Sequence, residues 1–146
     1  MVGVPLETQI AVGLQLVLTA ILSGLIGLDR ERNRNNAGLR THILVGVGAC
    51  LFTALSVRAF GEGDPGRVAA QIVTGIGFLG AGAILKENRR IRGLTTAASI
   101  WTTAAVGMAV AAGAWLIAII ATLIVWLVLS ALIRLEPYGI QPKDDA

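Results

Sequence analysis

The stretch that decides the fold runs from Asp64 to Thr103 and reads DPGRVAAQIVTGIGFLGAGAILKENRRIRGLTTAASIWTT. A glycine-rich apolar segment leads into a short basic loop, and a second apolar segment follows. The part from Gly75 to Gly80 fits the GxGxxG fingerprint of dinucleotide-binding proteins, but that fingerprint needs a preceding strand and a ribose-binding acid further on. These glycines lie inside an apolar run without turn residues. We therefore interpret the stretch as a membrane helix whose small residues let a neighbouring helix approach closely.

The composition of the whole chain agrees with a membrane protein. Of its 146 residues, 55% are hydrophobic and 14% are charged, and the mean hydropathy is +0.75. A soluble domain of this size cannot bury so much apolar surface. A membrane-spanning helix needs about 20 mostly apolar residues, and the sequence contains several such runs. We predict an all-α integral membrane protein with five spanning helices in a transmembrane domain over 8–133, followed by a tail over 134–146. The helices are expected at about 9–28, 39–57, 66–85, 94–112 and 114–133.

Within this domain we expect the first four helices to form a tight, glycine-rich bundle, with the fifth outside it and facing lipid. In the first helix, Gln15, Thr19, Ser23 and Gly27 recur every four residues and so share one face. In a bilayer such a polar, small-residue face is expected to contact other helices. The same argument predicts helix packing at the glycines. They are Gly24, Gly27, Gly75, Gly77, Gly80 and Gly82.

The charges predict an orientation. The N-terminal residues before the first apolar run contain no Lys or Arg, so we expect that run to stay as an anchor and not to be a cleaved signal. Most basic residues lie in the loops after the first and third helices, and only Arg58 and Arg67 fall at the other face. Positive residues gather on the cytoplasmic side. The N-terminus is therefore expected outside and the C-terminus in the cytoplasm.

Two acidic clusters are candidate functional sites. Asp29, Arg30 and Glu31 end the first helix. They are interpreted either as an ion or proton site, because acids near lipid are costly unless used, or as a solvated helix end whose arginine complements the helix dipole. Asp64 precedes Pro65 and suits a helix N-cap. The alternative is a polar cluster of Asp64 with Arg67 and Gln71 at the opposite membrane face.

The remaining polar candidates lie at the starts of the second and fourth helices. His42, beside Arg40 and Thr41, is interpreted as a pH sensor or as a hydrogen-bonding residue at the membrane interface. Thr95 and Thr96 either bond the backbone of their own helix or line a polar seam between the third and fourth helices. A single His and a single Cys make no zinc cluster, and no base is placed to activate a nucleophile. We expect no enzyme and no cofactor, cannot specify a metal, and expect the basic loops to meet lipid and not nucleic acid.

Four motifs in order resemble the MgtC/SapB family of bacterial inner-membrane proteins. They are GLIGLDRE (Gly24–Glu31), AGLRTH (Ala37–His42), DPGRVAAQIVTGIGFLGAGAIL (Asp64–Leu85) and RGLTTAASIWTTAAVGMA (Arg92–Ala109). The resemblance implies a multi-pass inner-membrane protein linked to growth in low magnesium and to survival inside macrophages. It also implies that some members restrain the F-type ATP synthase. The positions that the family pattern implies as functional include Asp29, Arg30, Glu31, Arg40, Thr41, His42, Asp64, Arg67, Gln71, Thr95 and Thr96.

The sequence also departs from the family pattern. Asp29 stands where many members have Glu, and Asn35-Asn36 stands where a Lys-Pro pair is usual. The soluble C-terminal domain of the larger, virulence-associated members has no counterpart here, so we expect a short, SapB-like member. Two functions remain open. The first is a regulatory protein, self-associating and binding another membrane complex such as the F-type ATP synthase under magnesium or acid stress. The second is a small ion or solute transporter that uses the two polar clusters.

Overall fold

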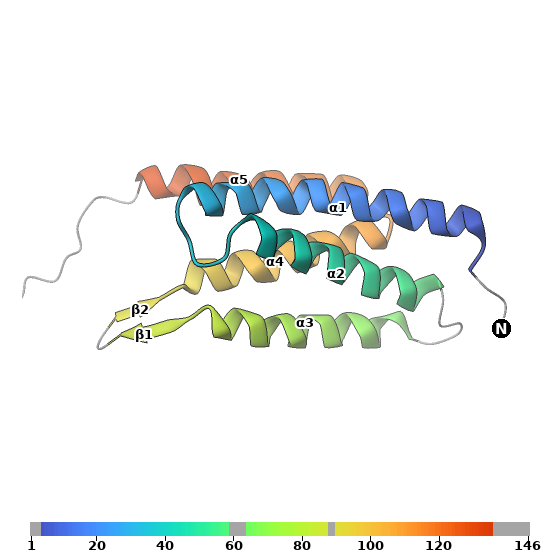
Figure 1. Ribbon diagram of the computed structural model, residues 1–146, viewed down its shortest axis with the longest axis horizontal. Coiled ribbons are helices and arrows are strands. Elements are labelled where there is room, and N and C mark those ends of the chain that lie inside the picture. The colour runs from blue at the N-terminus through green and yellow to red at the C-terminus, as the bar shows by residue number, and fades with distance from the viewer. Residues whose placement is uncertain (1–3, 59–63, 88–89, 136–146) are drawn as a thin grey trace, which may run out of the picture.

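The computed structural model describes residues 4–58, 64–87 and 90–135, which form five helices and one β-hairpin (Figure 1). The elements in chain order are α1 (Leu6–Arg32), α2 (Leu39–Arg58), α3 (Pro65–Gly82), β1 (Leu85–Glu87), β2 (Arg90–Arg92), α4 (Leu94–Ala111) and α5 (Trp115–Leu135). The predicted all-α class is confirmed apart from the short hairpin.

The helices lie roughly along one direction in three layers (Figure 1). α1 and α5 lie side by side along one edge, α2 and α4 occupy the middle, and α3 with the hairpin lies along the opposite edge. α2 packs on both α1 and α4, so these three helices form the centre of the molecule. α3 and α5 flank this centre on opposite sides.

Small side chains at four-residue spacing hold the central helices together. α1 contributes Thr19, Ser23 and Gly27, which are all buried, as the stripe in the sequence predicts. Two further ladders complete the contact, and they comprise Gly46, Cys50 and Ala54 of α2 and Ser99, Thr103, Gly107 and Ala111 of α4. A Cβ on Gly107 would overlap the carbonyl oxygen of Gly46. The backbones of α2 and α4 therefore touch, an arrangement typical of membrane helices.

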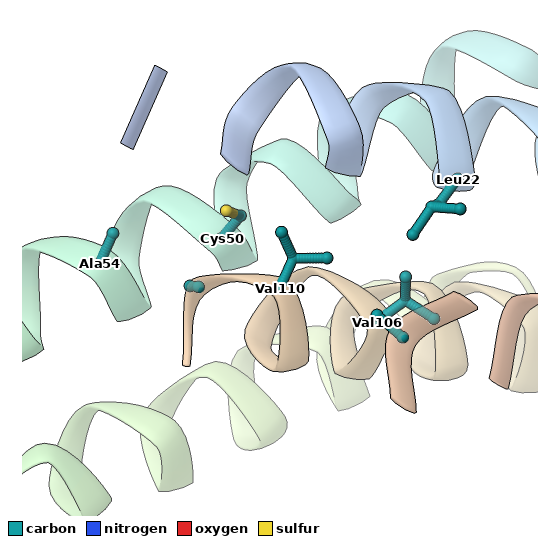
Figure 2. Packing of buried hydrophobic residues seen from close by; sticks show 7 residues of the cluster. Leu22, Cys50, Ala54, Val106 and Val110 are labelled. Atoms are coloured by element: carbon teal, nitrogen blue, oxygen red, sulfur yellow. The ribbon is translucent and has the colours of Figure 1, made fainter. Parts of the chain in front are cut away.

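Apolar side chains fill the space around the ladders. Figure 2 shows Leu22 of α1 near Val106 and Val110 of α4, with Cys50 and Ala54 on α2. Outward-facing side chains are also apolar: Leu14 and Ile117 are 67% and 65% exposed. A surface of this kind suits a lipid solvent, because soluble monomers rarely expose large continuous apolar patches.

Three of the described helices, α1, α2 and α4, are long and apolar enough to cross a membrane. The apolar part of α5 that the structure describes, Trp115–Ala131, is shorter, and α3 is not among the three. The chain is therefore a helical membrane protein. The count of five spans, the orientation of the termini and the domain limits stay predictions. Most of the expected tail lies in 136–146, outside the described residues.

The structure corrects two expectations on the third and fifth helices. α3 ends at Gly82 instead of 85, and the expected basic loop is a hairpin that pairs Leu85 with Arg92. Gly93 allows the return: its φ is +87°, and a Cβ there would overlap the carbonyl oxygen of Ala83. α5 is not wholly lipid-facing, because Ala118, Thr122 and Leu129 are buried and the helix packs on α1 and α4.

Candidate functional site

The junction of α1 and α2 brings together most of the first predicted cluster. Glu31 caps the N-terminus of α2: its Oε2 accepts a hydrogen bond from the Leu39 backbone N–H at 2.7 Å. A carboxylate at this place satisfies an unpaired amide and complements the helix dipole. Gly38 makes room for it, because a Cβ on Gly38 would lie 2.7 Å from the same oxygen. The Glu31 carboxylate therefore has a capping role, and it can lie this close to position 38 because glycine has no side chain.

Arg30 is buried in this junction, with only 2% of its surface exposed. Its Nη2 donates to Asn35 Oδ1, and the Asn35 amide donates back to the Arg30 carbonyl at 3.2 Å. The connecting turn passes through Arg34 at a φ of +54°. Arg30 Nε and Asp29 Oδ2 are both buried and have no hydrogen-bond partner. The end of α1 therefore contains polar groups that its own chain leaves unsatisfied.

His42 links this junction to α4. The ring is fully buried between the helices. Its Nδ1 lies 2.9 Å from the Gly38 carbonyl and its Nε2 lies 3.1 Å from Ser99 Oγ. A carbonyl only accepts, so Nδ1 carries a proton. The Ser99 hydroxyl also donates to the Thr96 carbonyl at 2.8 Å. We call Arg30, Glu31, His42 and Ser99 the junction cluster.

Other predicted residues near the junction face outward. Arg40, Thr41 and Thr95 are exposed, whereas Thr96 is buried with 4% of its surface exposed. Thr41 lines a cavity of 270 Å³ that also borders Gly82 and Ile100. A polar contact that α4 does make is from Ser99 to His42 of α2, whereas the seam was expected between the third and fourth helices.

The second predicted cluster lies at the other end of the helices, where α2 ends and α3 begins (Figure 1). Asp64 Oδ1 accepts from the Gly66 backbone N–H at 2.8 Å, as an N-cap does. Arg67 and Gln71 are exposed on α3. The structure does not bring this cluster to the junction cluster.

The predicted packing glycines divide into two groups. Gly24 and Gly27 of α1 pack on α2, and a Cβ on Gly27 would lie 2.8 Å from Leu39 Cα. Gly80 contacts α4 at Ala97. The packing predicted for Gly75, Gly77 and Gly82 within the bundle is wrong, because a Cβ on any of them would meet nothing within 4 Å. Gly75 and Gly82 are seven residues apart and share one side of α3, whereas Gly77 lies on roughly the opposite side.

Sequence reasoning missed several residues that the structure makes important. Gly46 and Gly107 let the backbones of α2 and α4 touch, and Asn35 holds Arg30. The two glycines have a recognisable signal, since each belongs to a ladder of small residues with four-residue spacing, as the α1 stripe does. Asn35 has no such signal, because its contact depends on the conformation of the turn.

α3 is bordered by open space on both sides. A groove of 490 Å³ lies between α2 and α3, and a cavity of 160 Å³ lies between α3 and α4 at Trp101 and Ala105. Within residues 4–58, 64–87 and 90–135, no three His, Cys, Asp or Glu side chains come together to hold a metal ion.

Comparisons with known proteins agree with the resemblance seen in the motifs. The family model described as the MgtC family matches residues 16–138. The putative magnesium transporter YhiD of Escherichia coli K12 is 46% identical over 124 residues, which cover 80% of this chain and 58% of that protein. Protein MgtC of Brucella abortus is 50% identical over 114 residues, covering 78% of this chain and 48% of that protein. Protein MgtC of Salmonella typhimurium is 46% identical over 112 residues, covering 77% and 48%.

This chain thus spans about half the length of the curated relatives it matches. No solved structure matches it. The family match covers all of the central helix contact from Thr19 to Ala111 together with both predicted polar clusters. The chain is a membrane protein that belongs to the MgtC family.

Proposed function

We propose that this protein is a multi-pass regulator in the bacterial inner membrane that binds another membrane complex through the outer face of α3. The observation that carries the proposal is an open row of small residues on that face. Ala70, Thr74, Gly77 and Ala81 follow each other at spacings of four, three and four residues, and all are exposed. Spacing of this kind lies along one side of a helix and permits close approach of a second helix.

The position of α3 supports this assignment. α1, α2 and α4 use their small residues against one another, so those contacts are already occupied. α3 lies at the edge of the molecule, and the neighbouring Phe78 is 82% exposed. A large aromatic side chain beside a small-residue row gives a partner helix both a groove and a ridge to pack against.

The F-type ATP synthase is the first partner to test, and adaptation to low magnesium or acid stress is the setting in which we expect the complex to matter. The magnesium connection is supported by the printed name of a relative, the putative magnesium transporter YhiD. Binding of a second copy through the same row is the other expected association.

Site-specific photocrosslinking from position 78 tests the proposal. The full chain with a photoreactive residue at Phe78 is expressed in membranes that contain ATP synthase, irradiated, and crosslinked products are identified by mass spectrometry. We expect a discrete product with a synthase subunit, lost when Gly77→Leu fills the row. Gly75→Leu is the matched control, because both glycines are open but Gly75 lies on a different side of α3. A product of the same yield in Gly77→Leu would contradict binding at this face.

A small transporter is the second candidate, favoured by unsatisfied polar groups inside the helix bundle. Thr19 Oγ1 and Ser23 Oγ are buried without hydrogen-bond partners, as are Asp29 Oδ2 and Arg30 Nε. Polar side chains that face a bundle interior often mark ion paths. Against this, α2 and α4 touch at Gly46 and Gly107, at the level of Thr19 and Ser23. Ion flux into liposomes containing the purified chain, abolished by Asp29→Asn, would favour transport over the regulator.

A further inference from the structure

The groove between α2 and α3 has a shape and a lining that differ from those of the row proposed above for a partner helix. Its walls come from Leu44 to Phe52 of α2 and from Val68 to Leu79 of α3. Gln71 is the single polar side chain among the lining residues. Gly48 and Gly75 make the groove deep, because a Cβ on either would meet nothing within 4 Å. Its volume is 490 Å³.

The length of the groove limits what can occupy it. At a rise of 1.5 Å per residue, the α2 wall extends about 12 Å and the α3 wall about 17 Å. The hydrocarbon core of a bilayer is about 30 Å thick. The groove therefore covers roughly one leaflet. A spanning helix would need twice this length, whereas the acyl chain of one phospholipid stays within a leaflet.

The order of side chains along α3 matches the order of groups in a phospholipid. Arg67, Gln71, Gly75 and Leu79 follow at intervals of four residues, about 6 Å apart along the helix. From its start, α3 presents first a cation, then an amide and then an apolar wall. A phospholipid has the matching order of a phosphate, then an ester and then the methylenes of its acyl chain. Arg58, the last residue of α2, adds a second cation at the same end. The Asp64 carboxylate there is engaged by the Gly66 amide.

We propose that this groove binds one anionic phospholipid, with its phosphate at Arg67 and Arg58, its ester region at Gln71 and one acyl chain along Gly48 and Gly75. Arginine pairs with phosphate through charge-assisted hydrogen bonds. The lipid fills the space that separates α3 from α2, so it holds α3 at a fixed distance from the central helices and leaves the Gly77 row free. This role is independent of the partner bound at that row.

Native mass spectrometry of the full chain in detergent tests the proposal. Delipidated protein is titrated with dioleoyl phosphatidylglycerol, and one bound lipid per chain is expected. Gly75→Leu and Gly48→Leu fill the groove from opposite walls and should each lower lipid affinity at least about tenfold. Gly77→Leu is the control for added volume on α3 and should bind as the unmodified chain does.

Two further parts of the experiment distinguish a bound phospholipid from free phosphate and from a bound protein. Arg67→Gln should weaken binding about tenfold, the loss expected for one charged hydrogen bond, whereas Arg32→Gln, at the other end of the helices, should not. Excess glycerol 3-phosphate should not displace the lipid, since it lacks the acyl chain. Displacement by glycerol 3-phosphate, equal binding by Gly75→Leu, or a change in chain copy number instead of lipid number would overturn the proposal.

Discussion

The contact between α2 and α4 and the helix α3 both contain glycine, but they use it in opposite ways. Gly46 and Gly107 let two backbones touch, and each has no room for a methyl group. Gly75, Gly77 and Gly82 meet nothing within 4 Å, although α3 is the more glycine-rich helix. The number of glycines in a membrane helix therefore says little about its packing. What matters is whether the small residues fall on the side that meets a neighbour.

The largest expected difference in stability is between alanine substitutions at these two places. Gly107→Ala should destabilise the protein by about 3 kcal/mol, because the new methyl group overlaps the Gly46 carbonyl and forces the helices apart. Gly77→Ala should instead be neutral or stabilise α3 by up to about 1 kcal/mol, through the higher helix propensity of alanine. The midpoint of thermal unfolding in detergent, followed by near-ultraviolet circular dichroism, measures both.

These two variants are expected to differ in sign. Equal destabilisation by Gly107→Ala and Gly77→Ala would show that α3 packs as tightly as the central helices, and would remove the basis for a free outer face.

A smaller effect is expected in the junction cluster, where the central helices bury polar groups. His42→Ala should cost about 2–3 kcal/mol, since it leaves a cavity and deprives Ser99 of its ring partner. Ser99→Ala should cost about 1 kcal/mol. Thr41→Ala is the matched control, because Thr41 is the adjacent residue but is exposed. A loss of stability in Thr41→Ala equal to that in His42→Ala would contradict a specific role of the buried ring.

The Glu31 cap should contribute less to stability than the buried His42 ring does. Glu31→Ala removes the acceptor for the Leu39 amide and should cost about 1 kcal/mol. Glu31→Gln keeps an oxygen at the same place and should recover most of this, lacking only the favourable charge at the helix N-terminus. Thermal unfolding of the three proteins at one pH measures the difference. Identical losses in the two variants would assign the effect to the charge and not to the hydrogen bond.

Much of the central architecture could be predicted because its signals are local. The apolar runs predict five helices, and the four-residue spacing of Thr19, Ser23 and Gly27 places the contact face of α1 correctly. The motifs likewise identified the MgtC family. These features depend on residues within one helix, or on short segments in a fixed order.

The features that sequence reasoning missed depend on pairing between distant residues. Ser99 lies 57 residues from His42, and nothing near either residue predicts their contact. The Glu31 cap reaches across eight residues, whereas the usual capping box spans three. The open glycines of α3 were mispredicted for the same reason, because their exposure depends on which side of α3 meets α4. The candidate sites were therefore predicted as clusters at two ends, but not by what each residue contacts.

The smallest expected effect concerns α3 and tests whether this helix unfolds together with the other helices. Asp64→Ala removes the N-cap at Gly66, which typically costs about 1 kcal/mol in a helix. Because α3 lies at the edge of the molecule, we expect the loss to appear as local opening and not as a lower global midpoint. Hydrogen exchange should quicken for the amides of residues 66–69, while those of α2 and α4 stay protected. Asp64→Asn keeps an oxygen acceptor and should exchange nearly as the unmodified chain does. If both variants lowered the protection of all helices together, α3 would belong to the same cooperative unit as the centre, and its open face could not move to meet a partner independently.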